Sequence, residues 1–392
     1  MLLSLALIFT IGLILGELFV KLKLPGFLGM ILTGLLLGPY ALDLISVDIL
    51  NISADLRTIA LVVILLRAGL SLDIEDLKQI GRPAILMAFI PATLELTAVI
   101  LLAPLLFDIG YFEAVILGSV LVAVSPAVVV PKMIRLMEEG YGKAKRIPHL
   151  IMASASVDDI FVIVIFTSLI SMYQSGDLAL GSFLLVPLAV LMGILAGILI
   201  GLLLSWFFRV FRVRDTIKVM ILLAVSLFVI VGEPRVNDVL PFSALLAVMV
   251  IGITFLNRSE ERALRLREKF SRVWVFAELV LFVLVGAAVD VHVALAAGPL
   301  ALLLLTVALT FRFGGVQLCL IGTNLESNER LFAGLSYLPK ATVQAAIGAI
   351  PLTLGVPGGD LILALAVFSI LVTAPLGAVG IDVTHTRFLE KG

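Results

Sequence analysis

The chain has 392 residues, of which 61% are hydrophobic and only 14% charged, and its formal net charge is −1. A soluble domain carries about 25% charged residues, so this composition is typical of a polytopic membrane protein and excludes an ordinary soluble enzyme. The single cysteine, Cys319, excludes a disulfide framework. The three histidines lie in separate segments, so no zinc or haem site is expected, and neither a cofactor nor a nucleic-acid partner is predicted.

The first twenty residues, Met1 to Val20, form a strongly apolar run. No basic residue precedes this run and no small-residue cleavage site follows it, so we interpret it as a retained first span rather than a signal peptide. Neither a separate soluble domain nor a lipidation motif is expected.

Apolar runs separated by charged residues or by proline and glycine predict about thirteen transmembrane helices. The expected fold class is therefore an all-α polytopic membrane protein. The approximate limits of the predicted spans are 2–20, 25–41, 57–72, 83–106, 112–136, 148–173, 181–208, 216–232, 239–256, 272–289, 295–322, 329–354 and 360–380.

The basic residues fall almost entirely on alternate loops between these spans. Of the 27 lysines and arginines, 22 lie on one set of loops, whereas the opposite loops hold only Arg57 and Arg235. Arg67, Arg312 and Lys340 lie inside spans. By the positive-inside rule, the N-terminus is expected outside and the C-terminus in the cytoplasm, in a plasma (inner) membrane.

A weak internal repeat relates the two halves of the chain. Leu65–Asp73 matches Phe282–Asp290, with glycine and aspartate both displaced by 217 positions, and Pro126 matches Pro339 at 213. About seven spans separate the copies, and this odd number predicts that the second copy runs the opposite way through the membrane. Inverted repeats are typical of secondary transporters. The expected limits are about 1–175 for the first repeat, 181–208 for a linker helix and 212–384 for the second repeat.

Two adjacent carboxylates, Asp158 and Asp159, lie in the sixth predicted span. A helix that begins near Pro148 reaches them after roughly 16 Å, which is near the middle of a bilayer core about 30 Å thick. Charges at that depth are costly and usually mark an ion or proton path. We therefore predict that Asp158 and Asp159 bind the transported cation, with the Ser156 hydroxyl as a further ligand.

Two spans contain helix breakers at positions related by the repeat. The fifth span contains Ser125-Pro126 and Pro131, and the twelfth contains Pro339-Lys340. Proline removes a backbone donor, and the freed polar groups are tolerated at membrane depth only where they face protein or a wet cavity. We predict two broken helices that cross, and expect ion ligands from the first break, with Lys340 or the aspartate pair compensating the helix dipoles. The candidate ligands of the first break are Ser125 and Val129.

Glu95 and Arg312 form a second polar constellation in matching spans of the two repeats. Each lies roughly 18–20 Å along its helix, near the middle of the membrane. Each alone would be costly there, whereas together they can pair. The pair is expected either to serve as a structural or gating ion pair or to take part directly in transport.

These residues resemble the monovalent cation/proton antiporters, and more narrowly the NHA-type sodium/proton exchangers. The resemblance covers nearly the whole chain and rests on Ala155–Ile160 around the aspartate pair, on Tyr337–Gly348 and on Leu66–Asp73. It implies an NhaA-like antiporter fold, a homodimer, elevator movement of a core domain and a role in pH homeostasis. The implied core bundle covers about 57–174 and 272–384, and the implied dimerisation bundle about 1–45 and 181–256.

The resemblance also implies roles for the charged residues. Asp159 corresponds to the principal ion ligand, while Asp158 assists it or forms a salt bridge with a basic residue. Many bacterial relatives supply a lysine where this chain has Arg312, which leaves Lys340 and Arg312 as candidate partners of Asp158. Because NHA-type members are similar in having a mid-membrane Glu–Arg pair, which Glu95 and Arg312 would match, we predict that Lys340 pairs with Asp158.

The function expected from the sequence is the exchange of Na⁺ or Li⁺ for H⁺, with both competing for Asp158 and Asp159. The alternatives are a K⁺/H⁺ antiporter and a sodium-coupled organic-anion symporter of the same architecture. A cation channel is less compatible, since that branch usually adds a cytoplasmic nucleotide-binding domain and this chain is expected to end shortly after its last span. Symporters of this type have fewer spans and use mainly neutral polar residues for sodium.

Overall fold

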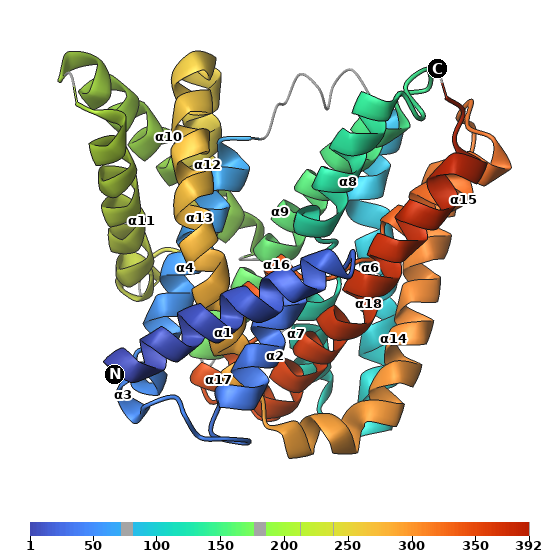
Figure 1. The fold of residues 1–392 in the computed structure, drawn as a ribbon. Coiled ribbons are helices and arrows are strands. Elements are labelled where there is room, and N and C mark those ends of the chain that lie inside the picture. Colours follow the sequence, from blue (N-terminus) through green and yellow to red (C-terminus); the bar gives the residue numbers. More distant parts are fainter. Residues whose placement is uncertain (72–80, 176–185, 212, 238, 392) are drawn as a thin grey trace. The chain divides into compact units, whose positions relative to one another are not determined.

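A computed structural model describes residues 1–71, 81–175, 186–211, 213–237 and 239–391. Within these residues the regular structure is helical, apart from an isolated β-bridge between Tyr141 and Lys391. The helices are α1 (Leu2–Lys21), α2 (Phe27–Leu37), α3 (Val47–Asn51), α4 (Ser53–Gly69), α6 (Arg82–Phe107), α7 (Tyr111–Leu121), α8 (Pro126–Glu139), α9 (Ile147–Ser175), α10 (Val186–Val210), α11 (Asp215–Asn237), α12 (Ala244–Arg258), α13 (Glu260–Ala288), α14 (Val291–Cys319), α15 (Ser327–Ser336), α16 (Thr342–Ile347), α17 (Ile350–Thr353) and α18 (Gly359–Phe388) (Figure 1).

The predicted spans coincide with these helices or with interrupted sets of them, which confirms the all-helical membrane fold. In the described residues, nine helices are long and apolar enough to cross a membrane, and shorter apolar helices cover three further segments. The count of thirteen spans therefore stays a prediction. The start of the span expected at 181 and the aspartate of the first repeat copy, Asp73, lie outside the described residues.

The tenth predicted span is extended by a charged segment. We expected it to begin at residue 272, but α13 begins at Glu260. Ion pairs at a spacing of four residues join Arg265 to Glu261 and Arg272 to Glu268, and such pairs stabilise an exposed helix without any apolar face. Hydrophobicity alone does not indicate this part of the helix.

Both predicted helix breaks are present. Residues 122–125 separate α7 from α8, and residues 337–341 separate α15 from α16. Pro126 begins α8, where its missing N–H costs nothing because the first turn of a helix has no internal partner for that group. The two breaks contact each other directly, because the N–H of Ser125 donates a hydrogen bond to the carbonyl of Pro339 at 2.8 Å.

The contacts within the chain divide it into two compact units. The first unit comprises Met1–Ala54, Ile74–Val162 and Leu281–Gly392, and the second comprises Asp55–Asp73 and Ile163–Val280. The assignment of particular segments to a core bundle and a dimerisation bundle stays a prediction.

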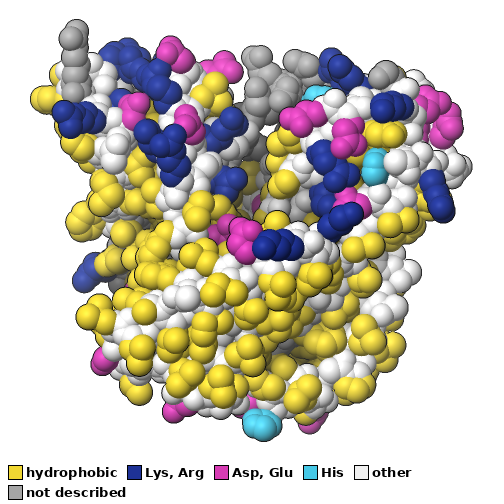
Figure 2. Space-filling view, viewed as in Figure 1, with side chains coloured by type: hydrophobic (Ala, Val, Ile, Leu, Met, Phe, Trp, Pro, Cys, Tyr) yellow, Lys and Arg dark blue, Asp and Glu magenta, His cyan; other side chains and the backbone are white. Residues whose placement is uncertain are grey.

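The first unit contains both breaks and packs tightly around them. α6 and α14 lie side by side, and a Cβ atom at Gly315 would lie only 2.7 Å from Cα of Pro91. α18 passes the second break equally closely, since a Cβ atom at Gly377 would lie 2.1 Å from Cγ of Pro339. Hydrophobic side chains cover the face formed by α1, whereas charged side chains gather over α8 and α18 (Figure 2). Lys132 of α8 contacts Asp382 of α18.

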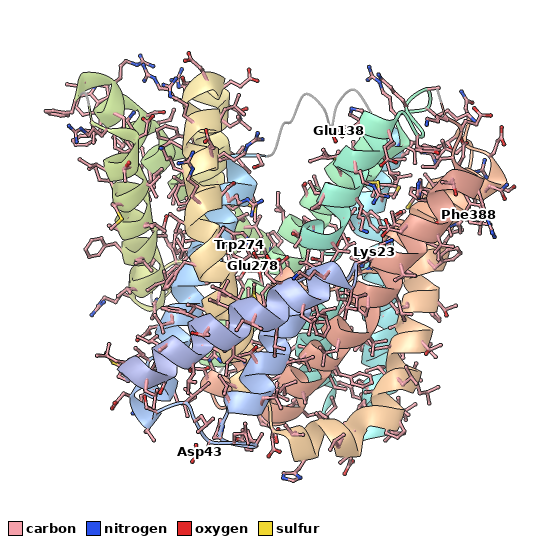
Figure 3. The ribbon with its side chains drawn as sticks, in the orientation of Figure 1. Lys23, Asp43, Glu138, Trp274, Glu278 and Phe388 are labelled. Atoms are coloured by element: carbon pink, nitrogen blue, oxygen red, sulfur yellow. The ribbon has the colours of Figure 1, made fainter. Side chains whose placement is uncertain are left out.

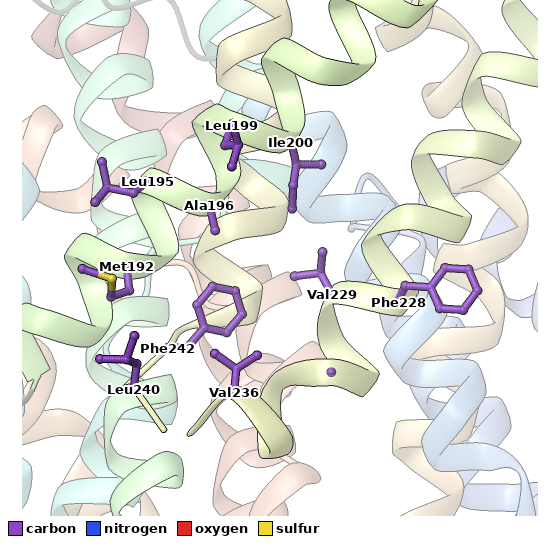
Figure 4. Close-up of a pocket in the computed structure, with 11 residues that line it drawn as sticks. Met192, Leu195, Ala196, Leu199, Ile200, Phe228, Val229, Val236, Leu240 and Phe242 are labelled. Atoms are coloured by element: carbon purple, nitrogen blue, oxygen red, sulfur yellow. The ribbon is translucent and has the colours of Figure 1, made fainter. Parts of the chain in front are cut away.

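The second unit is built around α10 and α12, which pack against each other. A groove of about 460 Å³ lies between α10 and α11, and its eleven lining residues are all apolar or glycine, including Met192, Phe228 and Phe242 (Figure 4). Trp274 and Glu278 lie one turn apart on α13 (Figure 3). This unit contributes none of the residues predicted to bind the ion.

Candidate ion-binding site

The two adjacent carboxylates on α9 have different surroundings. Asp158 is fully buried, and its Oδ2 atom accepts a hydrogen bond from the N–H of Val124, in the first break, at 2.9 Å. Asp159 is only partly buried, and its Oδ1 atom is enclosed without a hydrogen-bond partner among the described residues. Adjacent residues of a helix point about 100° apart, which explains why one side chain faces the break and the other does not.

The guanidinium of Arg312 is the centre of the site. Its Nη2 atom lies 3.0 Å from both oxygens of Asp158, and its Nη1 atom lies 2.8 Å from Oε2 of Glu95. Nε donates to the carbonyl of Tyr337 at 2.7 Å, and Nη1 also donates to the carbonyl of Val122. Arg312 and both acids are fully buried. The predicted Glu95–Arg312 pair is confirmed, and its two residues are 217 positions apart, the same displacement that relates the repeat copies.

Lys340 has a different partner from the one predicted. Its Nζ atom donates to Oε2 of Glu95 at 2.7 Å, and the ion pair of Asp158 is formed by Arg312. The backbone N–H of Lys340 donates to Oγ1 of Thr373 at 2.9 Å. The prediction that Lys340 pairs with Asp158 is therefore wrong. A planar guanidinium can bind two carboxylates at once, so Arg312 bridges Glu95 and Asp158, while the ammonium of Lys340 binds the same Oε2 atom of Glu95 as Arg312.

The helix ends explain why the arginine occupies this centre. The carbonyls of Val122 and Tyr337 follow the C-terminal ends of α7 and α15, where helix dipoles concentrate partial negative charge. Both carbonyls accept from Arg312, so one cation compensates both ends. The carboxylate of Asp158 compensates the opposite polarity, because Val124 lies two residues before Pro126, where α8 begins, and its N–H donates to Asp158.

The remaining predicted ligands differ in their availability. Ser125 is fully buried, and its Oγ atom has no hydrogen-bond partner among the described residues. Ser156 donates to the carbonyl of Met152 within its own helix at 3.0 Å, which leaves the oxygen lone pairs of its hydroxyl for other interactions. Val129 lies inside α8, beyond the extended break. Pro131 frees the carbonyl four residues before it, which is that of Ala127, so ligation by Val129 stays a prediction.

Gln344 lies within the Tyr337–Gly348 stretch, and no role was predicted for it. Its side chain is fully buried and makes three hydrogen bonds, two of them to carbonyls at the first break. The signal was available, because a lone amide in an apolar segment beside a helix break must find partners when it is buried. Thr373, which accepts from the backbone of Lys340, was missed as well, because nothing in the pattern of α18 distinguishes it from other membrane threonines.

A separate polar cluster joins the loop between α8 and α9 to the beginning of α15. Lys145 contacts Oε2 of Glu329 at 2.9 Å and Oε1 of Glu326 at 3.4 Å, both at the beginning of α15. The hydrogen bond to Glu329 raises the pKa of Lys145 above its usual 10.5. Glu329 also accepts from the backbone N–H of Glu326 at 2.7 Å, so the cluster joins the loop to the helix that leads into the second break.

Polydentate metal coordination by acids, cysteines and histidines is not available in the described part of the chain. No group of three or more such side chains lies together there. A monovalent cation at Asp159 would therefore need hydroxyl or backbone oxygens as further ligands. Hard cations accept such mixed oxygen sets readily.

Comparisons with known proteins identify the family of the chain. The family model described as "Sodium/hydrogen exchanger, transmembrane" matches residues 5–384. Sodium/hydrogen exchanger 9B2 of Homo sapiens is 33% identical over 388 residues, which cover 94% of this chain and 70% of that protein. Sodium/hydrogen exchanger 9B1 of Homo sapiens is 31% identical and covers 94% and 73%.

The fold also matches a solved structure. The sodium proton antiporter MjNhaP1 from Methanocaldococcus jannaschii superposes with a TM-score of 0.83 over 98% of this chain and 97% of that one, at 19% identity. This likeness concerns the fold alone, whereas the family match covers nearly the whole sequence. The predicted resemblance to monovalent cation/proton antiporters is thus confirmed, and the chain is a multi-pass membrane protein that belongs to the sodium/hydrogen exchanger family.

Proposed function

We propose that this protein exchanges Na⁺ or Li⁺ for H⁺ at a single site, where cation and proton compete for Asp159. Asp158 acts as the fixed neighbour that holds Arg312 and the first break in place. Protonation and cation binding exclude each other at one carboxylate, and this exclusion couples the two fluxes. Membership of the exchanger family and the sodium/proton antiporter fold support the proposal.

The observation that carries the proposal is the difference between the two acids. Asp158 is held by Arg312 and by the backbone of Val124, whereas Asp159 has an enclosed oxygen without a partner. A carboxylate left unpaired beside a helix break is costly unless it binds a proton or a cation. The unpaired acid is therefore the one that exchanges its ligand.

The charges around the site support a ratio of one proton per cation. Arg312 and Lys340 balance Glu95 and Asp158, and each of the four makes at least one ion pair between fully buried side chains. Asp159 then adds one negative charge, which either a proton or Na⁺ neutralises. We therefore expect electroneutral exchange. A membrane potential set with K⁺ and valinomycin should not change the sodium gradient at which net exchange stops. A shift with potential would refute the ratio.

The proposal is tested with Asp159→Asn in proteoliposomes. Proton movement driven by Na⁺ or Li⁺ gradients, followed with a fluorescent pH indicator, is expected to disappear in this variant. Asp360→Asn is the matched control, because Asp360 is an exposed acid at the first turn of α18. Normal sodium-driven proton movement by Asp159→Asn would overturn the assignment.

The same assay separates the alternative substrates. Adding K⁺ in place of Na⁺ tests a K⁺/H⁺ antiporter, and adding an organic anion together with Na⁺ tests a symporter. Strong proton movement with K⁺ alone, or anion uptake without proton movement, would replace sodium/proton exchange by that function.

We further propose a homodimer in a plasma (inner) membrane, with the N-terminus outside, the C-terminus cytoplasmic and elevator movement of a core domain. The division of the chain into two compact units supports such movement. Labelling by an impermeant maleimide in a Cys319→Ser background tests the topology. Glu390→Cys should react only from the cytoplasm and Asp43→Cys only from outside, and light scattering in detergent gives the oligomeric state.

A further inference from the structure

The side chain of Gln344, like that of Arg312, contacts both helix breaks. It lies in the first turn of α16, and its Oε1 atom accepts from the N–H of Ala341 at 2.9 Å. Its Nε2 atom donates to the carbonyls of Leu121 at 3.1 Å and Ala123 at 2.8 Å. Both N–H groups of the amide are thus used on one segment, and its oxygen is used on the other.

The hydrogen bonds of Gln344 limit which oxygens a cation can reach. Gln344 and Arg312 occupy two carbonyls each at the breaks, and the N–H of Ser125 occupies another. Each of these carbonyls already accepts from a buried donor, which uses one of its two lone pairs, so it is a weaker ligand for a cation than a free carbonyl. The occupied carbonyls are those of Leu121, Ala123, Val122, Tyr337 and Pro339.

We infer that Gln344 is a positioning residue that sets the cation selectivity of the exchanger. By holding the carbonyls of Leu121 and Ala123, it keeps the set of free carbonyl oxygens at the first break small and the segment between α7 and α8 rigid. It thereby also fixes Val124, whose N–H binds Asp158. A small, rigid oxygen set favours the smaller cations Na⁺ and Li⁺ over K⁺, because selectivity between hard cations depends on cavity size, ligand number and flexibility.

This inference rests on the proposed function, and Gln344→Met tests it. Methionine has a similar length but no hydrogen-bonding amide, so it releases both carbonyls as additional ligands. In proteoliposomes, we expect the apparent KM for Na⁺ to rise and the preference for Na⁺ over K⁺ to fall by about tenfold, while the maximal rate changes less. Correctly folded Gln344→Met with unchanged KM and unchanged Na⁺/K⁺ preference would overturn the inference.

Gln344→Glu provides a second test that does not depend on how well Gln344→Met folds. A protonated glutamate retains one donor for the two carbonyls, whereas the carboxylate repels both. On one preparation purified at acidic pH, the KM for Na⁺ relative to the unmodified protein should therefore rise as the pH increases. A constant ratio across the pH range would contradict the positioning role, because a purely structural defect in a folded sample has no such dependence.

Thr373→Val is the matched control at the other break. Thr373 binds the N–H of Lys340 and touches neither of the carbonyls that Gln344 holds, so this variant should keep the Na⁺/K⁺ preference. Asp159→Asn belongs in the same series. If Asp159→Asn exchanges normally, the proposed function fails; if it is inactive while the Gln344 variants keep their selectivity, only the role of Gln344 fails.

Discussion

Two clusters of ion pairs in this protein use the same kinds of groups in different surroundings. At the breaks, Arg312 and Lys340 bind two carboxylates, and all four side chains are fully buried. At the loop between α8 and α9, Lys145 also binds two carboxylates, but its own side chain is 25% exposed and that of Glu326 is 65% exposed, so only Glu329, at 3%, is buried. Both clusters link segments that are distant in sequence.

The difference between the clusters lies in what happens when one partner is removed. An exposed charge that loses its partner returns to water at little cost, so surface pairs contribute little to stability. A buried charge that loses its partner cannot be hydrated, so the cost is large even where the intact pair gives little net stabilisation. The four buried charges at the breaks therefore hold the broken segments in one arrangement. The loop cluster only strengthens the contact between the α8–α9 loop and the beginning of α15.

The largest effect is expected for Arg312→Met. This change leaves Asp158 and Glu95 without their shared cation and the carbonyls at two helix ends without a donor. Removing one member of a buried pair costs about 3–5 kcal/mol. The variant should therefore aggregate in detergent or have a melting temperature far below that of the unmodified protein. Arg312→Lys keeps the charge but loses the planar guanidinium. Its melting temperature should lie between those of the unmodified protein and Arg312→Met. An unchanged melting temperature for Arg312→Met would contradict the central role of the arginine.

A smaller effect is expected for Lys340→Met. Glu95 keeps Nη1 of Arg312 at 2.8 Å, so the remaining acid is under-paired rather than orphaned. The expected cost is about 1–3 kcal/mol, measured as a lower midpoint of thermal aggregation. The rate of exchange should become sensitive to membrane potential, because both loaded forms now carry a net negative charge, while the sodium gradient at zero flux stays unchanged. Equal destabilisation by Lys340→Met and Arg312→Met would contradict this order, because it would show that the two cations contribute equally to stability.

The smallest effect is expected for Lys145→Met at the loop cluster. When Lys145 is removed, Glu326 returns to water, and the buried Glu329 keeps its hydrogen bond from the backbone N–H of Glu326. The thermal midpoint should therefore fall less than in Lys340→Met, and the difference should shrink further in high salt. Because the pKa of Lys145 is raised in the folded protein, its contribution is fully present below pH 10.5 and is lost as the pH rises through the folded value. The midpoints of the two proteins should therefore differ equally between pH 6 and 9 and converge only in stronger alkali.

Much of the fold could be predicted from sequence because lipid imposes a simple rule. Spans must be apolar and helical, so the limits of α6, α9 and α14 follow from hydrophobicity to within a few residues. Proline at positions 126 and 339 likewise indicated where the helices break, since proline has no N–H for the helix ladder.

The partners within the site could not be predicted in the same way. Hydrophobicity and repeat symmetry placed Glu95 and Arg312 near the middle of the membrane and Lys340 beside a helix break, and the first two were paired correctly. Which cation binds Asp158 depends on where the ends of α7 and α15 meet, and that is a three-dimensional fact with no local pattern. The role of Gln344 was hidden for the same reason.

The hydrogen bond from Ser125 to Pro339 joins the two broken helices through main-chain atoms alone. A hydrogen bond between main-chain atoms does not depend on the identity of the side chains beside it. Substitutions of those side chains can therefore leave the bond between the two helix breaks intact. Only an imino acid at position 125, or an ester in place of that amide, would delete the donor. The sequence can therefore change widely while the fold is kept, which accords with a TM-score of 0.83 to MjNhaP1 at 19% identity.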